Sequence, residues 1–128
     1  MAKAELVAVS GIHETTGYAH AWRVDNLLFI SGQVAVNPQD EIVGKGDIRA
    51  QAEQAFANLQ TVLSAAGLTI RDVVKLTTLC TERSGIPAIR EARQRVFGGH
   101  TPASTLMIVA GLASPDLLVE IEAIAAVP

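Results

Sequence analysis

Two carboxylates near the end of the chain stand in a stretch that is otherwise apolar. Glu120 and Glu122 belong to the segment LLVEIEAIAAVP, and a strand there would direct both side chains to one face. A carboxylate half-buried among apolar neighbours has a raised pKa, which suits a general base. The pattern predicts a functional role for at least one of them; the alternative is a solvated strand edge.

The stretch GHTPASTLMIVAGL, residues 99–112, passes from small polar residues into an apolar run. Ser104 stands at the start of that run, so it marks either a site or only a turn. We read residues 103–110 as a central strand of the sheet. Its alternating positions are apolar on both faces, with Met107 on one and Leu106 and Ile108 on the other.

The remaining reactive side chains do not form a motif. His13, His20 and His100 are scattered, and Cys80 has no partner at metal-ligand spacing. We therefore expect no metal and an inert core cysteine.

The elements that must position these residues follow from periodicity and turn signals. A helix is predicted from an N-cap at Asp47 to a stop at Gly67, because apolar residues recur at three-and-four spacing between them. A second helix is predicted over 85–97, with Ser84 as its N-cap and Arg90, Arg93 and Arg95 on its polar side. Strands are predicted over 3–9, 20–24, 27–31, 73–82, 103–110 and 117–127.

This order predicts an α+β fold, a sheet with two helices on one face. Two helices cannot cover both apolar faces of the strand at 103–110. Since soluble monomers seldom expose a large apolar surface, we predict a homo-oligomer that buries the second face and binds ligands in clefts between subunits.

Length and composition limit the function further. The 128 residues contain no linker, which predicts a single domain over 1–128. The N-terminus lacks the apolar core of a signal peptide, and no run is long enough to span a membrane, so we expect a cytoplasmic protein. A net charge of −3 disfavours nucleic acid as a partner.

Several stretches together resemble the RidA (YjgF/YER057c/UK114) family. They are GYAHAWRVDNLLFISGQVAVNP, AGLTIRDVVKLTT, TPAST and VEIEAIA, and they extend over essentially the whole chain. The resemblance implies a chorismate-mutase-like fold, a homotrimer and pockets between subunits. Its best-known members hydrolyse reactive enamines and imines to keto acids and ammonia, with no metal or organic cofactor.

The resemblance also assigns site residues. Tyr18 matches a pocket tyrosine, Ser31 and Gly32 match the pocket Ser-Gly of the ISGQ motif, and Glu120 matches the glutamate that handles water. Deaminating members carry a carboxylate-binding arginine where this chain has Ser104.

The missing arginine leaves the substrate open. Leu106 likewise replaces a common cysteine, and Arg90, where those members often have asparagine, is a candidate to supply the missing charge from a neighbouring subunit. His100 is a candidate for the pocket rim, and the alternative is a solvated histidine in a loop. We expect a RidA-like hydrolase for an imine, enamine or related C–N substrate that depends less on a free carboxylate. The alternative is a trimer that binds a small metabolite without turnover, and the ribonuclease activity reported in the family fits the acidic chain least.

Overall fold

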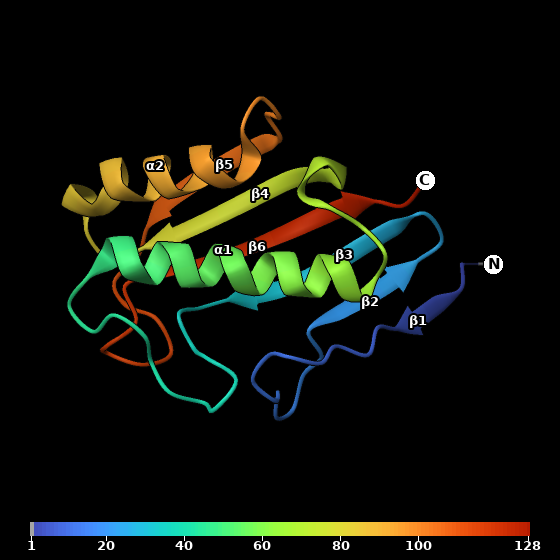
Figure 1. Ribbon diagram of the computed structural model, residues 1–128, viewed down its shortest axis with the longest axis horizontal. Coiled ribbons are helices and arrows are strands. Elements are labelled where there is room, and N and C mark those ends of the chain that lie inside the picture. Colours follow the sequence, from blue (N-terminus) through green and yellow to red (C-terminus); the bar gives the residue numbers. More distant parts are fainter. Residues whose placement is uncertain (1) are drawn as a thin grey trace.

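The computed structural model describes residues 2–128 and contains one six-stranded mixed sheet with two helices on one of its faces (Figure 1). The sheet order is β1-β2-β3-β6-β4-β5, and only the β4–β5 pair is parallel. The strands are β1 Ala4–Leu6, β2 Ala21–Val24, β3 Leu27–Gln33, β4 Val73–Cys80, β5 Ala103–Ile108 and β6 Val119–Ala126. The helices are α1 Ile48–Ala65 and α2 Ile86–Phe97, with short 3₁₀ turns η1 Ile70–Asp72 and η2 Arg83–Gly85. The predicted α+β architecture is confirmed.

Helix α1 packs across the centre of the sheet, against β3 and β6. Its predicted ends are confirmed: the Asp47 carboxylate accepts a hydrogen bond from the Ala50 amide at 3.1 Å, and Gly67 has a φ of +74°. Its buried face carries Phe56, Leu59 and Leu63, which contact the inward side chains of the sheet in one apolar core.

Helix α2 does not begin as the sequence suggested. Ser84 is not its N-cap, because Ser84 lies inside η2 and its hydroxyl donates to the Glu82 carboxylate at 3.3 Å. The N-cap is Gly85, without a side-chain hydrogen bond. A Cβ on Gly85 would collide with the end of the Ile48 side chain, so a larger residue there would displace Ile48 at the start of α1.

The prediction of a central strand at residues 103–110 was wrong. β5 ends at Ile108 and lies at the edge of the sheet. The chain passes from β4 through α2 to β5, which pairs in parallel with the free side of β4, because β6 occupies the other side. Ser104 therefore sits at an outer edge of the protomer.

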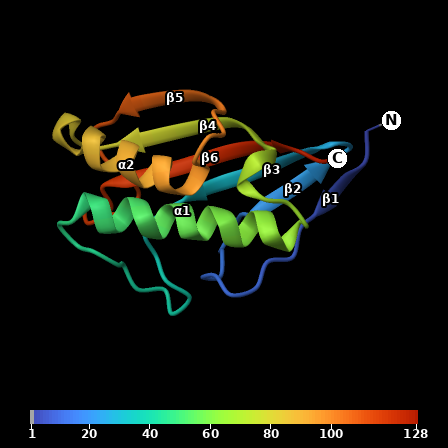
Figure 2. The ribbon, with the colours of Figure 1, turned by 45° about the horizontal axis from the view of Figure 1, so that its top comes forward.

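Within residues 2–128, no helix covers the face of the sheet opposite α1 and α2 (Figure 2), and large apolar side chains are exposed on it. Trp22, Phe29 and Met107 on this face are 45%, 43% and 46% exposed. The expectation of an apolar second face is confirmed, whereas the oligomer that would cover it stays a prediction.

Candidate functional site

Glu120 and Gly32 form the centre of the candidate site. A bulge between β3 and β6 places Ser31 and Gly32 opposite the single residue Glu122, since Ile30 pairs with Ala123 and Gln33 with Ile121. A Cβ on Gly32 would lie 2.7 Å from Cδ of Glu120, so the carboxyl group rests against the glycine backbone.

The environment of Glu120 raises its pKa above the ordinary value, chiefly through burial and secondly through the negative charge of Glu122. Glu120 is half-buried and Glu122 is exposed. Val119, which precedes them, and Ile121, which lies between them, are in the core. Both carboxylates thus lie on the open face, as the alternation predicted. A carboxylate with a raised pKa is suited to accept and return a proton near neutral pH.

The bulge is fastened to the loop that carries Tyr18. The Ser31 hydroxyl donates to the Ala19 carbonyl at 2.5 Å, and the Ser31 amide donates to the His20 carbonyl at 2.9 Å. Tyr18 itself is 51% exposed, and its ring is in edge contact with that of His20. Ser31, Gly32 and Glu120 thus form one strip of the protomer, and Tyr18 lies in the loop that is fastened to Ser31.

Gln33 and His20 support this strip through hydrogen bonds on its buried side. The direction of each hydrogen bond follows from its acceptor. A carbonyl only accepts, so the His20 Nε2 that lies 2.8 Å from the His13 carbonyl carries the ring proton. The Gln33 amide nitrogen donates to the Ser31 carbonyl and, at 3.2 Å, to Nδ1 of His20. The hydrophobic pattern does not predict that Gln33 is buried; it is fully buried because the bulge turns its side chain inward.

A cavity of about 320 Å³ lies beside this network and extends along the loop before β2. Its lining includes the rings of Tyr18, His13 and His20 and the apolar side chains of Leu6, Val9 and Ile12. Burial and the neighbouring His20 lower the pKa of His13, and Asp40 partly offsets this. His13 is therefore neutral near physiological pH and adds no charge to the cavity.

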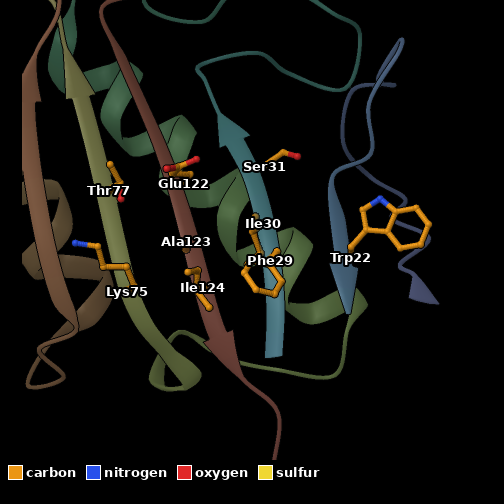
Figure 3. A pocket seen from close by; sticks show the side chains of 9 residues that line it. All are labelled: Trp22, Phe29, Ile30, Ser31, Lys75, Thr77, Glu122, Ala123 and Ile124. Carbon is orange, nitrogen blue, oxygen red and sulfur yellow. The ribbon is translucent and has the colours of Figure 1, made fainter. Parts of the chain in front are cut away.

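A second hollow, of about 280 Å³, lies on the open face of the sheet (Figure 3). Trp22 and Phe29 supply its aromatic side, and Lys75 and Glu122 its charged groups from β4 and β6. Lys75 donates to the Thr105 hydroxyl at 2.7 Å across the strand pair. The hollow is continuous with the apolar open face and adjoins the Ser31–Glu120 strip.

Ser104 and Arg90 lie apart from this strip within one protomer. Ser104 is in register with Leu76, which faces the helices, while Glu120 lies on the open face with β4 between the two strands. Arg90 is exposed on α2. Their predicted roles in the same pocket require a second copy of the chain and stay predictions.

A third cavity, of about 170 Å³, does contain Ser104, and the arginine that lines it is Arg93 rather than Arg90. His100 lines it as well. Its predicted place at the rim of a pocket between subunits stays a prediction. The helical pattern could not separate the two arginines, because both lie on the polar side of α2.

The described part of the chain offers little for other chemistry. Residues 2–128 contain no group of three or more His, Cys, Asp or Glu side chains placed to hold a metal ion. Within the same range, no helix has the length and apolarity needed to cross a membrane. Cys80 is buried, and burial raises the pKa of its thiol, in agreement with an inert core cysteine.

The chain thus combines an α+β sheet that has two helices on one face with a carboxyl group held against a bulged Ser-Gly pair. The family description that matches residues 9–127 is Endoribonuclease L-PSP, and the chain belongs to this family, also called the RidA (YjgF/YER057c/UK114) family. The resemblance seen in the sequence motifs is confirmed.

Individual relatives agree with this assignment over most of their length. The mouse protein named 2-iminobutanoate/2-iminopropanoate deaminase is 37% identical over 108 residues, which are 84% of this chain and 79% of that protein. The crystal structure of yeast YEO7 has a TM-score of 0.93 at 31% identity and covers 98% of this chain and 100% of its own. Escherichia coli TdcF, solved with bound serine, has a TM-score of 0.89 at 29% identity, with 97% and 99% covered.

Proposed function

We propose that this chain is a hydrolase for an imine or enamine and that it works as a homotrimer with its pockets between subunits. The observation that carries the proposal is the half-buried Glu120 carboxyl group held against Gly32, with a pKa raised by burial. Relatives named as 2-iminobutanoate/2-iminopropanoate deaminases, such as the mouse protein, support the reaction class.

The hydrolysis needs one proton acceptor and no covalent intermediate with the protein. Glu120 takes a proton from water as the water oxygen bonds to the C=N carbon, the π electrons move to nitrogen, and Glu120 then gives that proton to the nitrogen. In the resulting amino alcohol Glu120 takes the hydroxyl proton and passes it to the amine, so that the C–N bond breaks, ammonia leaves and a carbonyl group remains. An enamine enters the same route after protonation at carbon.

The strip constrains which side chains hold the substrate. The hydroxyl proton of Ser31 is already donated to the Ala19 carbonyl, so Ser31 offers only its lone pairs to a ligand N–H group. Tyr18 is exposed, and its hydroxyl is free to donate. Tyr18 therefore serves as the donor and Ser31 as the acceptor on either side of the bulge.

The test generates 2-iminopropionate in situ with an amino-acid oxidase and follows its decay, in parallel with an uncharged imine. The wild type should accelerate decay of at least one of them, and Glu120→Gln should abolish the acceleration. Glu122→Gln is the matched control, because Glu122 is exposed beside Glu120 and should retain most of the activity.

Non-catalytic binding of a metabolite is the second candidate. It is favoured by position 104, where a serine offers no charge to stabilise an anionic substrate. Binding of a small ligand together with no acceleration by the wild type for either imine would contradict the hydrolase and support this candidate. If only Ser104→Arg accelerated decay of the imine, Glu120 and its neighbours would be able to catalyse the hydrolysis but would lack a group that binds the anionic substrate.

A further inference from the structure

The cavity beside the loop before β2 is separate from the strip of Ser31, Gly32 and Glu120. Its lining residues all lie within residues 6–20, at the end of β1 and in the segment that joins β1 to β2, which is the blue loop of Figure 1. Its volume, about 320 Å³, is at the lower end of the range for small-molecule sites. The cavity therefore has room for a small ligand of its own.

Hydrogen bonds fix the shape of this segment at two points. The Val7 amide donates to the Ala21 carbonyl at 3.1 Å, and the His20 ring donates to the His13 carbonyl at 2.8 Å. Ile12, on the apolar wall of the cavity, belongs to the core of the protein. The wall is therefore anchored to the rest of the fold.

His13 is a buried polar residue of this wall whose ring lacks a partner. The residue is only 6% exposed, and neither ring nitrogen has a hydrogen-bond partner within residues 2–128, with Nδ1 fully buried. A buried polar group without a partner costs free energy, and a ligand with a matching group removes that cost. Because burial lowers the pKa of His13, its ring is neutral and one nitrogen offers a lone pair. The matching ligand is a hydrogen-bond donor.

Acidic side chains set the charge of the cavity. Glu14 lines it and forms neither an ion pair nor a side-chain hydrogen bond in the part of the chain that the structure describes. His20 also lines it, but its Nδ1 accepts a hydrogen bond from Gln33, so this ring is neutral. The negative charge of Asp40 acts on His13 from nearby. Since the lining residues include no lysine or arginine of the described chain, the cavity favours a cation.

We propose that this cavity is a binding site for a small alkylammonium ion, which donates a hydrogen bond to the His13 ring and faces the Glu14 carboxylate. A primary ammonium group has three N–H donors and one positive charge, which match an imidazole lone pair and a carboxylate. The hydroxyl of Thr15 lines the same cavity and accepts the third N–H group. The alkyl chain packs against the apolar wall at Ile12.

The site goes beyond the proposed hydrolysis, because it binds an amine that is not a substrate. Tyr18 is the residue that links the two. It lines the amine cavity, and its loop is fastened to the Ser31 hydroxyl through the Ala19 carbonyl. A bound alkylammonium ion would therefore lie beside the loop that we propose to hold the imine.

Titration with n-butylammonium chloride, followed through the backbone amide resonances of the isotope-labelled protein, tests the site without turnover. The largest shifts should fall within residues 12–20. Butan-1-ol lacks the charge and tetramethylammonium lacks the N–H donors, so both should bind more weakly than n-butylammonium. Sodium butyrate, which has the opposite charge, should not bind in this loop.

Two variants and one control test the named side chains. His13→Phe keeps a ring and should weaken n-butylammonium binding by about tenfold or more, because a hydrogen bond to a charged group is lost. Glu14→Gln, at an exposed position, should weaken it by about threefold, as expected for a solvent-exposed ion pair. Glu5→Gln is the matched control: Glu5 is exposed on β1 next to the cavity but does not line it, so this variant should bind as the wild type does.

Several results would overturn the site. They are unchanged n-butylammonium affinity in His13→Phe, shifts centred on Gly32 and Glu120 instead of the loop, and equal binding of n-butylammonium and butyrate. Failure of the proposed function looks different: n-butylammonium binding would still depend on His13, while no imine would be hydrolysed. Glu120→Gln should lose turnover and keep n-butylammonium binding, which separates the two.

Discussion

Glu120 and Gly32 are packed so closely that no side chain fits between them: a Cβ on Gly32 would lie 2.7 Å from Cδ and 2.9 Å from Oε1 of Glu120. Gly32 has an ordinary backbone conformation, so the constraint at this position is space and not backbone strain. The carboxyl group thus takes its position from the absence of a side chain on the neighbouring strand.

Gly32→Ala should therefore leave the chain folded and displace the Glu120 carboxyl group. The clashing atoms are the end of a flexible side chain, so the expected loss of stability is about 1 kcal/mol. Displacing a catalytic group by about 1 Å should lower turnover of the imine by roughly a hundredfold. Gly111→Ala is the matched control, because a Cβ there meets nothing within 4 Å and should change neither quantity. Wild-type turnover in Gly32→Ala would contradict the placement of Glu120.

Glu120 should make folding stability depend on pH in a defined direction. Its pKa is raised in the folded chain, so the folded state holds this proton more tightly than the unfolded state does. Its contribution is fully present below the ordinary value of 4.5 and is lost as the pH rises through the raised value. Thermal unfolding across pH 4 to 8 should show the wild type losing stability relative to Glu120→Gln over this range.

The comparison with Glu120→Gln is needed because His13 acts in the opposite direction. Its pKa is lowered by burial, so its contribution is fully present above the ordinary value of 6.5 and is lost as the pH falls through the lowered value. His13 is unchanged in Glu120→Gln, and the difference between the two proteins cancels its effect. A difference that is constant with pH would contradict the raised pKa of Glu120.

The hydrogen bonds of Gln33 should determine how firmly the Tyr18 loop is held. Gln33→Met keeps the volume and leaves Nδ1 of His20 and the Ser31 carbonyl without their donor. We expect a loss of about 1–3 kcal/mol in unfolding free energy and faster amide exchange over residues 13–20. Gln60→Met, on the exposed side of α1, is the control and should show neither change. Unchanged exchange in Gln33→Met would show that the loop is held by Ser31 alone.

The features of the fold that the sequence predicted correctly are those that hydrophobic periodicity and helix capping determine. The alternation around Glu120 identified its face, and the spacing between Asp47 and Gly67 identified α1 with both ends. The apolar pattern of residues 103–110 predicted a strand but not the position of that strand in the sheet. Where one face of the sheet is apolar and uncovered, edge and central strands show the same pattern of apolar residues. Position in a sheet depends on pairing between distant segments.

The polar residues inside the core could not be predicted from a binary pattern. Gln51 and Asn58 lie on the buried side of α1, where Gln51 donates to the carbonyls of Gly44 and Asp116 and Asn58 donates to those of Val34 and Val36. The carbonyls that they bind lie in backbone outside the named strands, and that need arises only once the loops are placed. The cavity lined by Arg93 could not be predicted for a related reason, since it forms from a helix and a strand that meet only in the fold.

The open face should drive assembly, and the single tryptophan of the chain reports on it. Trp22 and Phe29 are 45% and 43% exposed on adjacent strands in register, and an oligomer would bury both. Phe29→Asp should weaken assembly by about 2–4 kcal/mol, because an aromatic contact is lost and a charge is placed in an apolar interface. Light scattering should show the wild type as a trimer and Phe29→Asp as a monomer with Trp22 emission shifted to the red.

Gln39→Asp, in an exposed loop outside the sheet, adds the same charge and should remain trimeric. A wild-type monomer at micromolar concentration would contradict assembly through this face, and would also separate the Ser104 cavity from the Glu120 strip.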